Sequence, residues 1–481
     1  MPVRSGPPSF ALPQAARKRL EARVAEAAAR AARARRPVVV AVTAPVSADL
    51  DLSAAVLLAR RADDRFFCLE QPERARFCLA TLGATRIVQE RGPERFSAAA
   101  AACRRVVAGA LVDDLADDPG APSASGPVWV GGFAFADDGG AEPQWSSLAP
   151  AQLVLPELAL ARSGDQARLT LTAVVHAGEP AAAVIERVDR RLAELRPATN
   201  EPLERDAGAA PGVAGALPPE HYEQAVRAAV ERIAAGELEK VVLAREVRVE
   251  RSARFDPAAV LDGLRAAFPA CYCFCVGAPE LAFLGASPEL LVRREGSRAS
   301  SVALAGTIGR SADPRLDAEL GEQLRSSAKN LAEQAIVAAR IERALAPVSV
   351  WVSRPDEPVL IQVKNVQHLA TPIRAQLAEP RSVLELAELL HPTPAVGGEP
   401  RQRAGPLIAE LERLDRGWYG GPLGWMDLAE DGELCVALRC ALLREGVARL
   451  YAGGGIVRDS VPAEELAETE VKLQALLPLL A

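Results

Sequence analysis

The chain has 481 residues, too many for one hydrophobic core of ordinary size, so two domains or one large one are expected. Hydrophobic residues make up 49% and charged residues 25%, a composition typical of globular proteins that excludes a disordered chain. The net charge of −7 gives no reason to expect a nucleic-acid partner, and no apolar stretch approaches the ~20 residues that cross a bilayer. We therefore expect a cytoplasmic protein with neither a nucleic-acid nor a membrane partner.

The amino-terminal part of the chain is predicted to mix strands and helices. An arginine- and alanine-rich segment at 17–36 predicts a solvated amphipathic helix, because no apolar signal core accompanies it. Apolar runs predict strands at 37–46 and 128–137. Alternation predicts an antiparallel strand pair at 157–163 and 167–175, and helical spacing predicts a helix at 181–195. We expect residues 1–200 to form an α+β region, and residues 201–217, rich in proline, glycine and charge, to form a linker.

A lysine opens the first strand of the carboxyl-terminal part, in a chain that hardly uses lysine. A helix is predicted over 219–235 and a strand over 240–250, with Lys240 at the start of the strand. Only five of the 56 basic residues are lysines, and a site keeps lysine where it needs a compact ammonium or an amine that can lose its proton. Alternation places Lys240 on one face with Glu246 and Arg248, which is also typical of an ordinary exposed lysine. The strand pattern alone leaves both interpretations open.

Two predicted helices each combine a glutamate with a lysine four residues away. The helix at 326–345 contains Lys329 and Glu333, and the last helix of the chain contains Glu468 and Lys472. Such pairs are commonly exposed ion pairs worth roughly 0.3–0.5 kcal/mol. Alternatively, one carboxylate from each helix could bind Mg²⁺, which typically takes one or two carboxylates together with substrate and water. The spacing does not decide between the two.

Two short segments combine turn residues with groups that could serve a site. Glu289 follows a Ser-Pro turn and precedes a predicted strand, where a solvated turn carboxylate is the simpler interpretation. Residues 303–310, ALAGTIGR, predict a small-residue turn whose backbone amides could bind an anion, although a single Gly-Thr is a weak signal.

Glycine-rich segments border predicted strands near the end of the chain, at 418–425 and 451–457. Glycine inside a sheet lowers stability unless backbone or ligand must approach closely, so these segments are candidates for a binding site. Between them, residues 433–443 predict one strand that carries Arg439 among apolar neighbours. An arginine in such a strand commonly binds a carboxylate through its planar fork.

Ten short segments occur in order between residues 218 and 481: LEKVVLAR, ASPELL, ALAGT, KNLAEQ, HLATPI, LLHPTPAVGG, YGGPLGW, ALRCALL, AGGGIV and AETEVKL. Together they resemble the chorismate-utilising enzyme superfamily, which includes isochorismate, salicylate, anthranilate and aminodeoxychorismate synthases. The resemblance implies that residues 218–481 form the catalytic domain. It also implies an α/β (α+β) fold, a large sandwich of mainly antiparallel sheets flanked by helices, with chorismate and Mg²⁺ in a central cleft.

The resemblance assigns chemistry to the lysine and to the turn carboxylate. Members that add water carry a lysine at the position of Lys240, so the chain resembles an isochorismate synthase. In that reaction Lys240 deprotonates water for attack at C2 of chorismate, and Glu289 protonates the C4 hydroxyl as it leaves. A base must be uncharged when it accepts a proton and an acid must hold one, so both side chains are expected to be desolvated.

The resemblance also implies a metal site and a substrate site. Glu333 and Glu468 match the family's Mg²⁺ ligands, with Glu465 binding through water, and the metal would neutralise the ring carboxylate. Tyr419 and Arg439 match positions that hold the enolpyruvyl carboxylate. The complete set of implied substrate-binding residues is Gly306, Thr307, His368, Ala395, Tyr419, Arg439, Gly453, Gly455 and Lys472.

Three alternatives remain beside isochorismate synthase. Salicylate synthases use the same site and then eliminate pyruvate, but they tend to carry threonine at the position of Ala395. Anthranilate and aminodeoxychorismate synthases need a glutamine amidotransferase partner and lack the lysine base, so Lys240 disfavours them. A non-catalytic chorismate-binding homologue would have no need of base, acid and metal ligands together. We expect a monomer without an amidotransferase subunit, in a menaquinone or a siderophore pathway, and residues 1–200 resemble the extension of menaquinone-pathway members.

Overall fold

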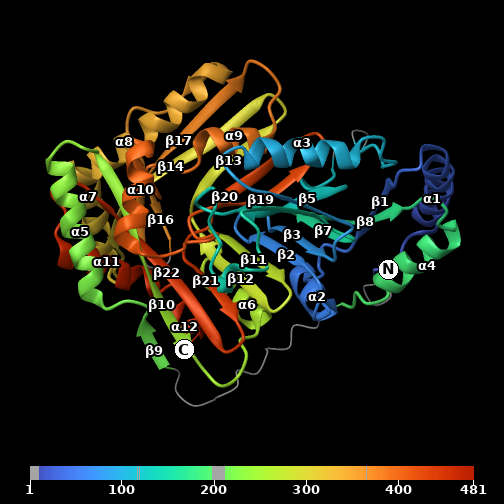
Figure 1. The fold of residues 1–481 in the computed structure, drawn as a ribbon, viewed down its shortest axis with the longest axis horizontal. Helices are drawn as coiled ribbons and strands as arrows, with labels where there is room; N and C mark the ends of the chain where they lie inside the picture. The colour runs from blue at the N-terminus through green and yellow to red at the C-terminus, as the bar shows by residue number, and fades with distance from the viewer. Residues whose placement is uncertain (1–9, 116–117, 119, 198–211, 364–365, 481) are drawn as a thin grey trace.

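The computed structural model describes residues 10–115, 118, 120–197, 212–363 and 366–480, and its strands form two large sheets (Figure 1). Sheet A has twelve strands among the described residues, in the spatial order β1 (Val38–Val46), β8 (Gln166–Val175), β7 (Leu158–Ser163), β3 (Phe77–Leu82), β2 (Phe66–Gln71), β11 (Tyr272–Ala278), β12 (Leu281–Ser287), β21 (Cys440–Arg444), β22 (Val447–Ile456), β10 (Lys240–Glu250) and β18 (Gly398–Glu399), with β9 (Gly212–Gly215) also beside β10.

Sheet B has ten strands within the same described ranges, and its strand pairs, like those of sheet A, are antiparallel. Their spatial order is β15 (Ser349–Ser353), β17 (Val366–Leu377), β14 (Arg298–Gly309), β13 (Leu290–Glu295), β20 (Gly432–Val436), β19 (Pro422–Asp427), β5 (Val128–Phe133), β6 (Ala151–Leu155) and β4 (Arg86–Glu90), with β16 (Val359–Gln362) also beside β17.

Helices cover both outer sides of the two sheets. Figure 1 shows α3 and α9 over one side and α2 and α6 over the other. The helices are α1 (Gln14–Ala34), α2 (Leu52–Ala59), α3 (Arg95–Val107), α4 (Ala181–Leu192), α5 (Pro219–Ala234), α6 (Pro257–Ala267), α7 (Pro314–Ser326), α8 (Ala328–Leu345), α9 (Val383–Leu390), α10 (Arg401–Glu412), α11 (Pro462–Leu473) and α12 (Leu477–Leu480). In the described part of the chain, no helix has the length and apolarity needed to cross a membrane.

The two sheets pack face to face around a shared apolar core. Along β2, Phe66 and Cys68 face the core under helices α1, α2 and α6, while Phe67 and Leu69 face the core between the sheets, where they share a cluster with Trp425 of sheet B. This alternation is the period of two expected of a strand that is buried on both faces. The predicted α+β sandwich of mainly antiparallel sheets flanked by helices is confirmed.

Both sheets run through both parts of the chain. In sheet A β2 pairs with β11, and in sheet B β5 pairs with β19, so the segments 1–200 and 218–481 share their sheets and cores. The proposed division into an amino-terminal region and a catalytic domain stays a prediction. Of the predicted linker, residues 201–211 lie outside the described residues, and Gly212–Gly215 forms β9.

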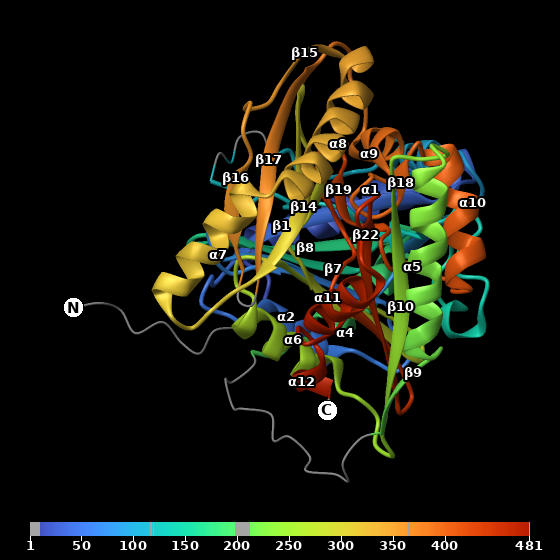
Figure 2. The same cartoon turned by 90° about the vertical axis from the view of Figure 1, so that its left-hand side faces the viewer.

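The strand that begins at Lys240 extends over the predicted residues, but its mixed face does not face solvent. Val241 and Leu243 pack under α5 and α10, which lie side by side next to β10 (Figure 2). The opposite face, which carries Lys240 and Val242, points into the protein and is buried. The interpretation of Lys240 as an exposed lysine is therefore wrong, because neighbouring elements cover both faces of this strand.

Two other local predictions are wrong. The segment 303–310 is not a turn: residues 303–309 belong to β14, where a β-bulge at Gly306, with φ of 76°, interrupts the pairing with β17. Residues 433–443 are not one strand: β20 ends at Val436 in sheet B and β21 begins at Cys440 in sheet A. Arg439 lies at the crossover between the sheets, with a left-handed backbone at φ of 46°.

Candidate active site

A pocket lies where β10, β14, β17 and β22 meet helices α8 and α11 and the crossovers between the sheets. It gathers nearly every predicted site residue from distant parts of the chain. The predicted residues that line it are Glu289, Gly306, Thr307, Glu333, His368, Ala395, Tyr419, Arg439, Gly453, Gly455, Glu465, Glu468 and Lys472. Lys240 is not itself part of the lining but lies directly behind Glu333.

The Lys240 side chain is completely buried, with 0% of its surface exposed. Its Nζ lies 2.8 Å from Glu333 Oε1, although no partner among the described residues is aligned for a hydrogen bond with the amine. Glycine at position 455 makes this arrangement possible. A Cβ atom at Gly455 would lie 2.5 Å from Glu333 Oε1 and 3.0 Å from Lys240 Cε. Close approach of two functional side chains therefore explains a glycine inside β22.

Glu289 lies at a second crossover between the sheets, after β12 of sheet A and before β13 of sheet B. Only 3% of the residue is exposed, so the interpretation as a solvated turn carboxylate is wrong. Burial raises the pKa of the Glu289 carboxyl to about 8, against the opposing effect of the Lys240 charge. At neutral pH the Glu289 carboxyl therefore holds its proton and can donate it.

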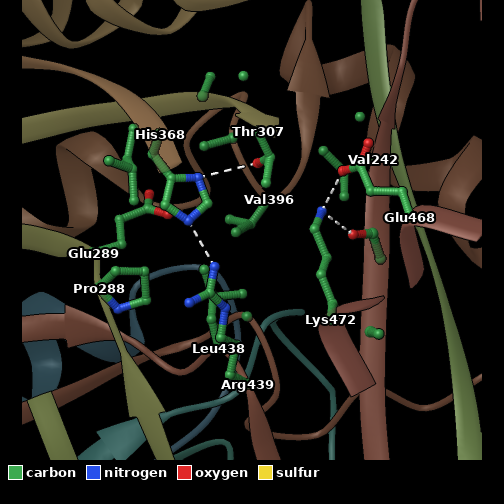
Figure 3. A pocket seen from close by; sticks show the side chains of 18 of the residues that line it. Val242, Pro288, Glu289, Thr307, His368, Val396, Leu438, Arg439, Glu468 and Lys472 are labelled. Atoms are coloured by element: carbon green, nitrogen blue, oxygen red, sulfur yellow. Dashed lines mark hydrogen bonds and ion pairs between the residues drawn. The ribbon is translucent and has the colours of Figure 1, made fainter. Parts of the chain in front are cut away.

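His368 connects Thr307 to Arg439 on the same side of the pocket as Glu289 (Figure 3). Burial, together with the charges of Arg439 and Lys472, lowers the pKa of His368 well below its usual value, so the ring is neutral. Arg439 Nη2 donates to His368 Nε2 at 2.6 Å. Because arginine can only donate, the ring proton is on Nδ1, which donates to Thr307 Oγ1 at 3.0 Å.

The second terminal nitrogen of Arg439, Nη1, is buried and has no hydrogen-bond partner in the described part of the chain. A buried guanidinium nitrogen without a partner costs free energy unless a ligand supplies an acceptor. Tyr419 lies nearby in the lining, and its ring stacks on that of Tyr451 at 5.3 Å. This side of the pocket therefore suits a carboxylate, the group that arginine binds best.

Glu468 and Lys472 lie on the opposite side of the pocket from His368 and Glu289 (Figure 3). Lys472 Nζ donates to Glu468 Oε1 and to the backbone oxygen of Gly453, both at 2.7 Å. The predicted ion pair within α11 is confirmed. The pair expected within α8 is not formed, because Lys329 Nζ lies 3.2 Å from Glu465 Oε1 while Glu333 contacts Lys240 on β10.

The three carboxylates Glu333, Glu465 and Glu468 all lie close enough to Lys329 for their charges to affect it. Burial alone would lower the pKa of Lys329, yet the charges of these three glutamates raise it above its usual value. The described residues contain no preformed group of three or more side chains that could hold a metal ion. The donor set nevertheless fits Mg²⁺, a hard cation that takes one or two carboxylate oxygens and completes its shell with water and substrate.

Several lining residues were missed from sequence: Lys329, Asn330, Val396, Arg416 and Tyr451. The rarity of lysine could have identified Lys329, which is one of the five in the chain. Arg416 lies two residues before the glycine-rich segment at 418–425, and an arginine in that place could have been recognised as a candidate. Asn330 and Val396 carry no comparable signal.

Comparisons with known proteins identify the family of the chain. A family model described as chorismate binding enzyme matches residues 25–481. The chain is 40% identical to the salicylate biosynthesis isochorismate synthase of Pseudomonas aeruginosa over 408 residues, which is 85% of this chain and 83% of that relative. It is 37% identical to isochorismate synthase MenF of Bacillus subtilis over 358 residues, 74% of this chain and 75% of the relative. The structure of MenF, the menaquinone-specific isochorismate synthase of Escherichia coli, matches with a TM-score of 0.75 at 28% identity, over 92% of this chain and 95% of that one. The chain therefore belongs to the family of chorismate-binding enzymes.

Proposed function

We propose that this protein is an isochorismate synthase, which converts chorismate to isochorismate by adding water at C2 and releasing the C4 hydroxyl. One observation carries the proposal: a fully buried lysine amine and a buried carboxyl with a pKa of about 8 lie close enough at one pocket for their charges to interact. The relatives named above are isochorismate synthases, which supports the same activity in this chain.

Lys240 is the general base in this proposal. Its uncharged amine removes a proton from water as the water oxygen forms a bond to C2 of chorismate. The ring double bonds shift, and the C4–O bond breaks as Glu289 gives its proton to the departing hydroxyl. One water enters and one water leaves, so the reaction is an isomerisation. The carboxyl is protonated at neutral pH, as a general acid must be.

Chorismate carries two carboxylates, and the pocket offers a different environment to each. Arg439, held by His368, would bind the enolpyruvyl carboxylate through its free Nη1, with Tyr419 beside it. Glu333 and Glu468 would hold Mg²⁺, with Glu465 acting through water, and Lys472 would lie by the ring carboxylate. The bound metal would neutralise that carboxylate, which otherwise repels the glutamates. The remaining proposed contacts to the ring come from residues of the pocket wall: Gly306, Thr307, Ala395, Gly453 and Gly455.

The decisive experiment is a product analysis. The protein is incubated with chorismate and Mg²⁺, and the products are separated by liquid chromatography. Isochorismate without pyruvate supports the proposal. Salicylate with equimolar pyruvate would identify a salicylate synthase, and anthranilate formed from ammonia would contradict the role of Lys240. Binding of chorismate without any product would identify a non-catalytic homologue.

The proposal includes a monomer that needs no amidotransferase subunit. Turnover by the purified chain alone supports it, and light scattering during size-exclusion chromatography measures the mass against the 50.8 kDa of one chain. A requirement for a second polypeptide would contradict this part of the proposal.

A further inference from the structure

The outer edge of β10 is only partly covered by other strands. Along its inner edge β10 pairs with β22 from Val241 to Glu250. Along its outer edge β18 pairs with the first two residues, Lys240 and Val241, and β9 pairs with residues 247–250. The backbone next to these strands extends the cover by one bond at each end, from Val242 N–H to Gly397 O at 2.7 Å and from Ala216 N–H to Glu246 O at 3.0 Å. Between these bonds, the outer edge of β10 around Val242 O and Ala244 faces no strand of the described chain. Buried backbone groups in such a gap still need hydrogen-bond partners.

Two charged side chains fill this gap. The backbone N–H of Ala244 donates to Glu412 Oε1 at 2.7 Å, and Arg416 Nη2 donates to the backbone oxygen of Val242 at 3.0 Å. Arg416 Nε also donates to Glu412 Oε2 at 2.9 Å, so the two side chains form one unit. Each residue is only 4% exposed. The pair thus takes the place of a missing strand beside β10.

The same guanidinium also holds the wall of the pocket. Arg416 Nη1 donates to the backbone oxygen of Val396 at 2.8 Å. The guanidinium carbon lies 4.1 Å from the centre of the Phe135 ring and 5.7 Å from that of Tyr419. Val396 and Tyr419 line the pocket. Arg416 therefore ties the strand of the catalytic lysine to two parts of the pocket wall and to the amino-terminal half of the chain.

We propose that the buried Glu412–Arg416 pair is a positioning unit for Lys240. It fixes β10 at Val242 and Ala244, two and four residues beyond the lysine on the same face of the strand, and so sets where the amine meets the substrate. This inference rests on the proposed function, because it concerns the base of that reaction. A displacement of about 1 Å at a reacting group can lower a rate about 100-fold, so a small shift of β10 matters.

The first test compares Glu412→Gln with Glu433→Gln. Both glutamates are buried and paired with arginines, but Glu433 pairs with Arg74 and Arg293 and does not line the pocket. Glutamine at 412 can still accept the Ala244 N–H but no longer holds the charge of Arg416. We expect kcat to fall about 10- to 100-fold with KM for chorismate within about twofold of wild type. Glu433→Gln should keep kcat even where it lowers Tm. Equal loss of kcat in both variants, or no loss in Glu412→Gln, would overturn the proposal.

Arg416→Lys is the second variant, for use where Glu412→Gln does not fold. Lysine keeps the buried charge, but one ammonium cannot reach Val242, Val396 and Glu412 in the geometry of a planar fork. It should reproduce the fall in kcat. The double variant Lys240→Ala with Arg416→Lys should then have the same residual activity as Lys240→Ala alone, because the Glu412–Arg416 pair acts through Lys240. Additive losses would show that Arg416 acts independently of Lys240.

Hydrogen–deuterium exchange separates this inference from the proposed function. In Glu412→Ala the amide of Ala244 loses its acceptor, so peptides covering residues 240–246 should exchange faster than in wild type. Peptides of β11 should exchange as before. Unchanged exchange over 240–246 would refute the positioning unit whether or not the wild type makes isochorismate. If exchange rises but the wild type forms no isochorismate, only the proposed reaction fails.

Discussion

Lys240 and Glu333 form a contact that joins the start of β10 to the second turn of α8, with 2.8 Å between Nζ and Oε1. The lysine is fully buried, and 14% of the glutamate side chain is exposed. A buried lysine needs a polar partner, and the carboxylate supplies one. The proposed base and a proposed metal ligand are therefore neighbours, and the contact places the amine at the edge of the pocket rather than in the apolar core.

Replacement of Lys240 by alanine should remove turnover but not substrate binding. The loss of a general base lowers a rate by about 10²- to 10⁴-fold. Chorismate affinity should stay near that of wild type, because the groups proposed to hold its carboxylates are untouched. Kinetics and calorimetric titration with chorismate measure the two effects. Lys18→Ala, at an exposed position of α1, is the matched control and should change neither. Retained activity in Lys240→Ala would refute the role of this residue as the base.

The environment of the site could not be predicted as well as its residues. Ordered segments such as LEKVVLAR and ASPELL identified Lys240 and Glu289, because those matches depend only on the local sequence. Alternation along β10 showed which residues share a face with Lys240, but not that the face is buried. That depends on elements such as α8, whose Glu333 contacts Lys240 and which lies far along the chain from β10.

The crossovers between the two sheets could not be predicted from the local sequence either. The apolar run at 433–443 has the composition of one strand, yet it divides between two sheets at Arg439, where neither glycine nor proline marks the left-handed backbone. Spacing within α8 likewise favoured a pair between Lys329 and Glu333. Each side chain instead has a partner on another element, and a helical repeat contains no information about such partners.

Activity should fall as pH rises through the pKa of Glu289. The carboxyl must be protonated to act as an acid, and burial raises its pKa to about 8, so kcat should fall above that pH. Below that pH, where the wild-type carboxyl is protonated, Glu289→Gln should lose activity by about 10²- to 10⁴-fold. A pH profile of kcat from 6 to 9 measures this, and a constant kcat over that range would contradict the assignment.

The raised pKa of the Glu289 carboxyl should also make the stability of the protein depend on pH. Its folded pKa, about 8, lies above the ordinary value of 4.5, so the folded state binds the proton more tightly than the unfolded state. The stabilisation from the protonated carboxyl is complete below about pH 4.5 and is lost as pH rises toward 8. Relative to Glu289→Gln, the wild type should therefore lose Tm over this range and change little above it. Thermal unfolding of both proteins at several pH values tests the sign.

Gly455→Ala should disturb the site without unfolding the protein. The added Cβ would lie 2.5 Å from Glu333 Oε1 and 3.0 Å from Lys240 Cε, so the glutamate must move away from the lysine. We expect kcat to fall about 10- to 100-fold, as for other displacements of reacting groups by about 1 Å. Gly309→Ala on β14 is the control, because no atom lies within 4 Å of its added Cβ, and it should stay active. Wild-type kinetics in Gly455→Ala would show that the contact between Lys240 and Glu333 is dispensable.

Removal of Mg²⁺ should abolish activity. A comparison of two glutamates of α11 tests whether Glu468 binds the metal. Chelation by EDTA should stop turnover, and excess Mg²⁺ should restore it. Glu468→Gln should weaken Mg²⁺ binding by at least the ~10- to 100-fold that loss of an outer-shell partner costs. Glu464→Gln, one turn earlier on α11, exposed and outside the pocket lining, should bind Mg²⁺ as the wild type does. Calorimetric titration with Mg²⁺ in the absence of chorismate measures affinity independently of turnover. Equal Mg²⁺ affinity in the two variants would mean that Glu468 is not a ligand, since the charge removed is the same and only the position differs.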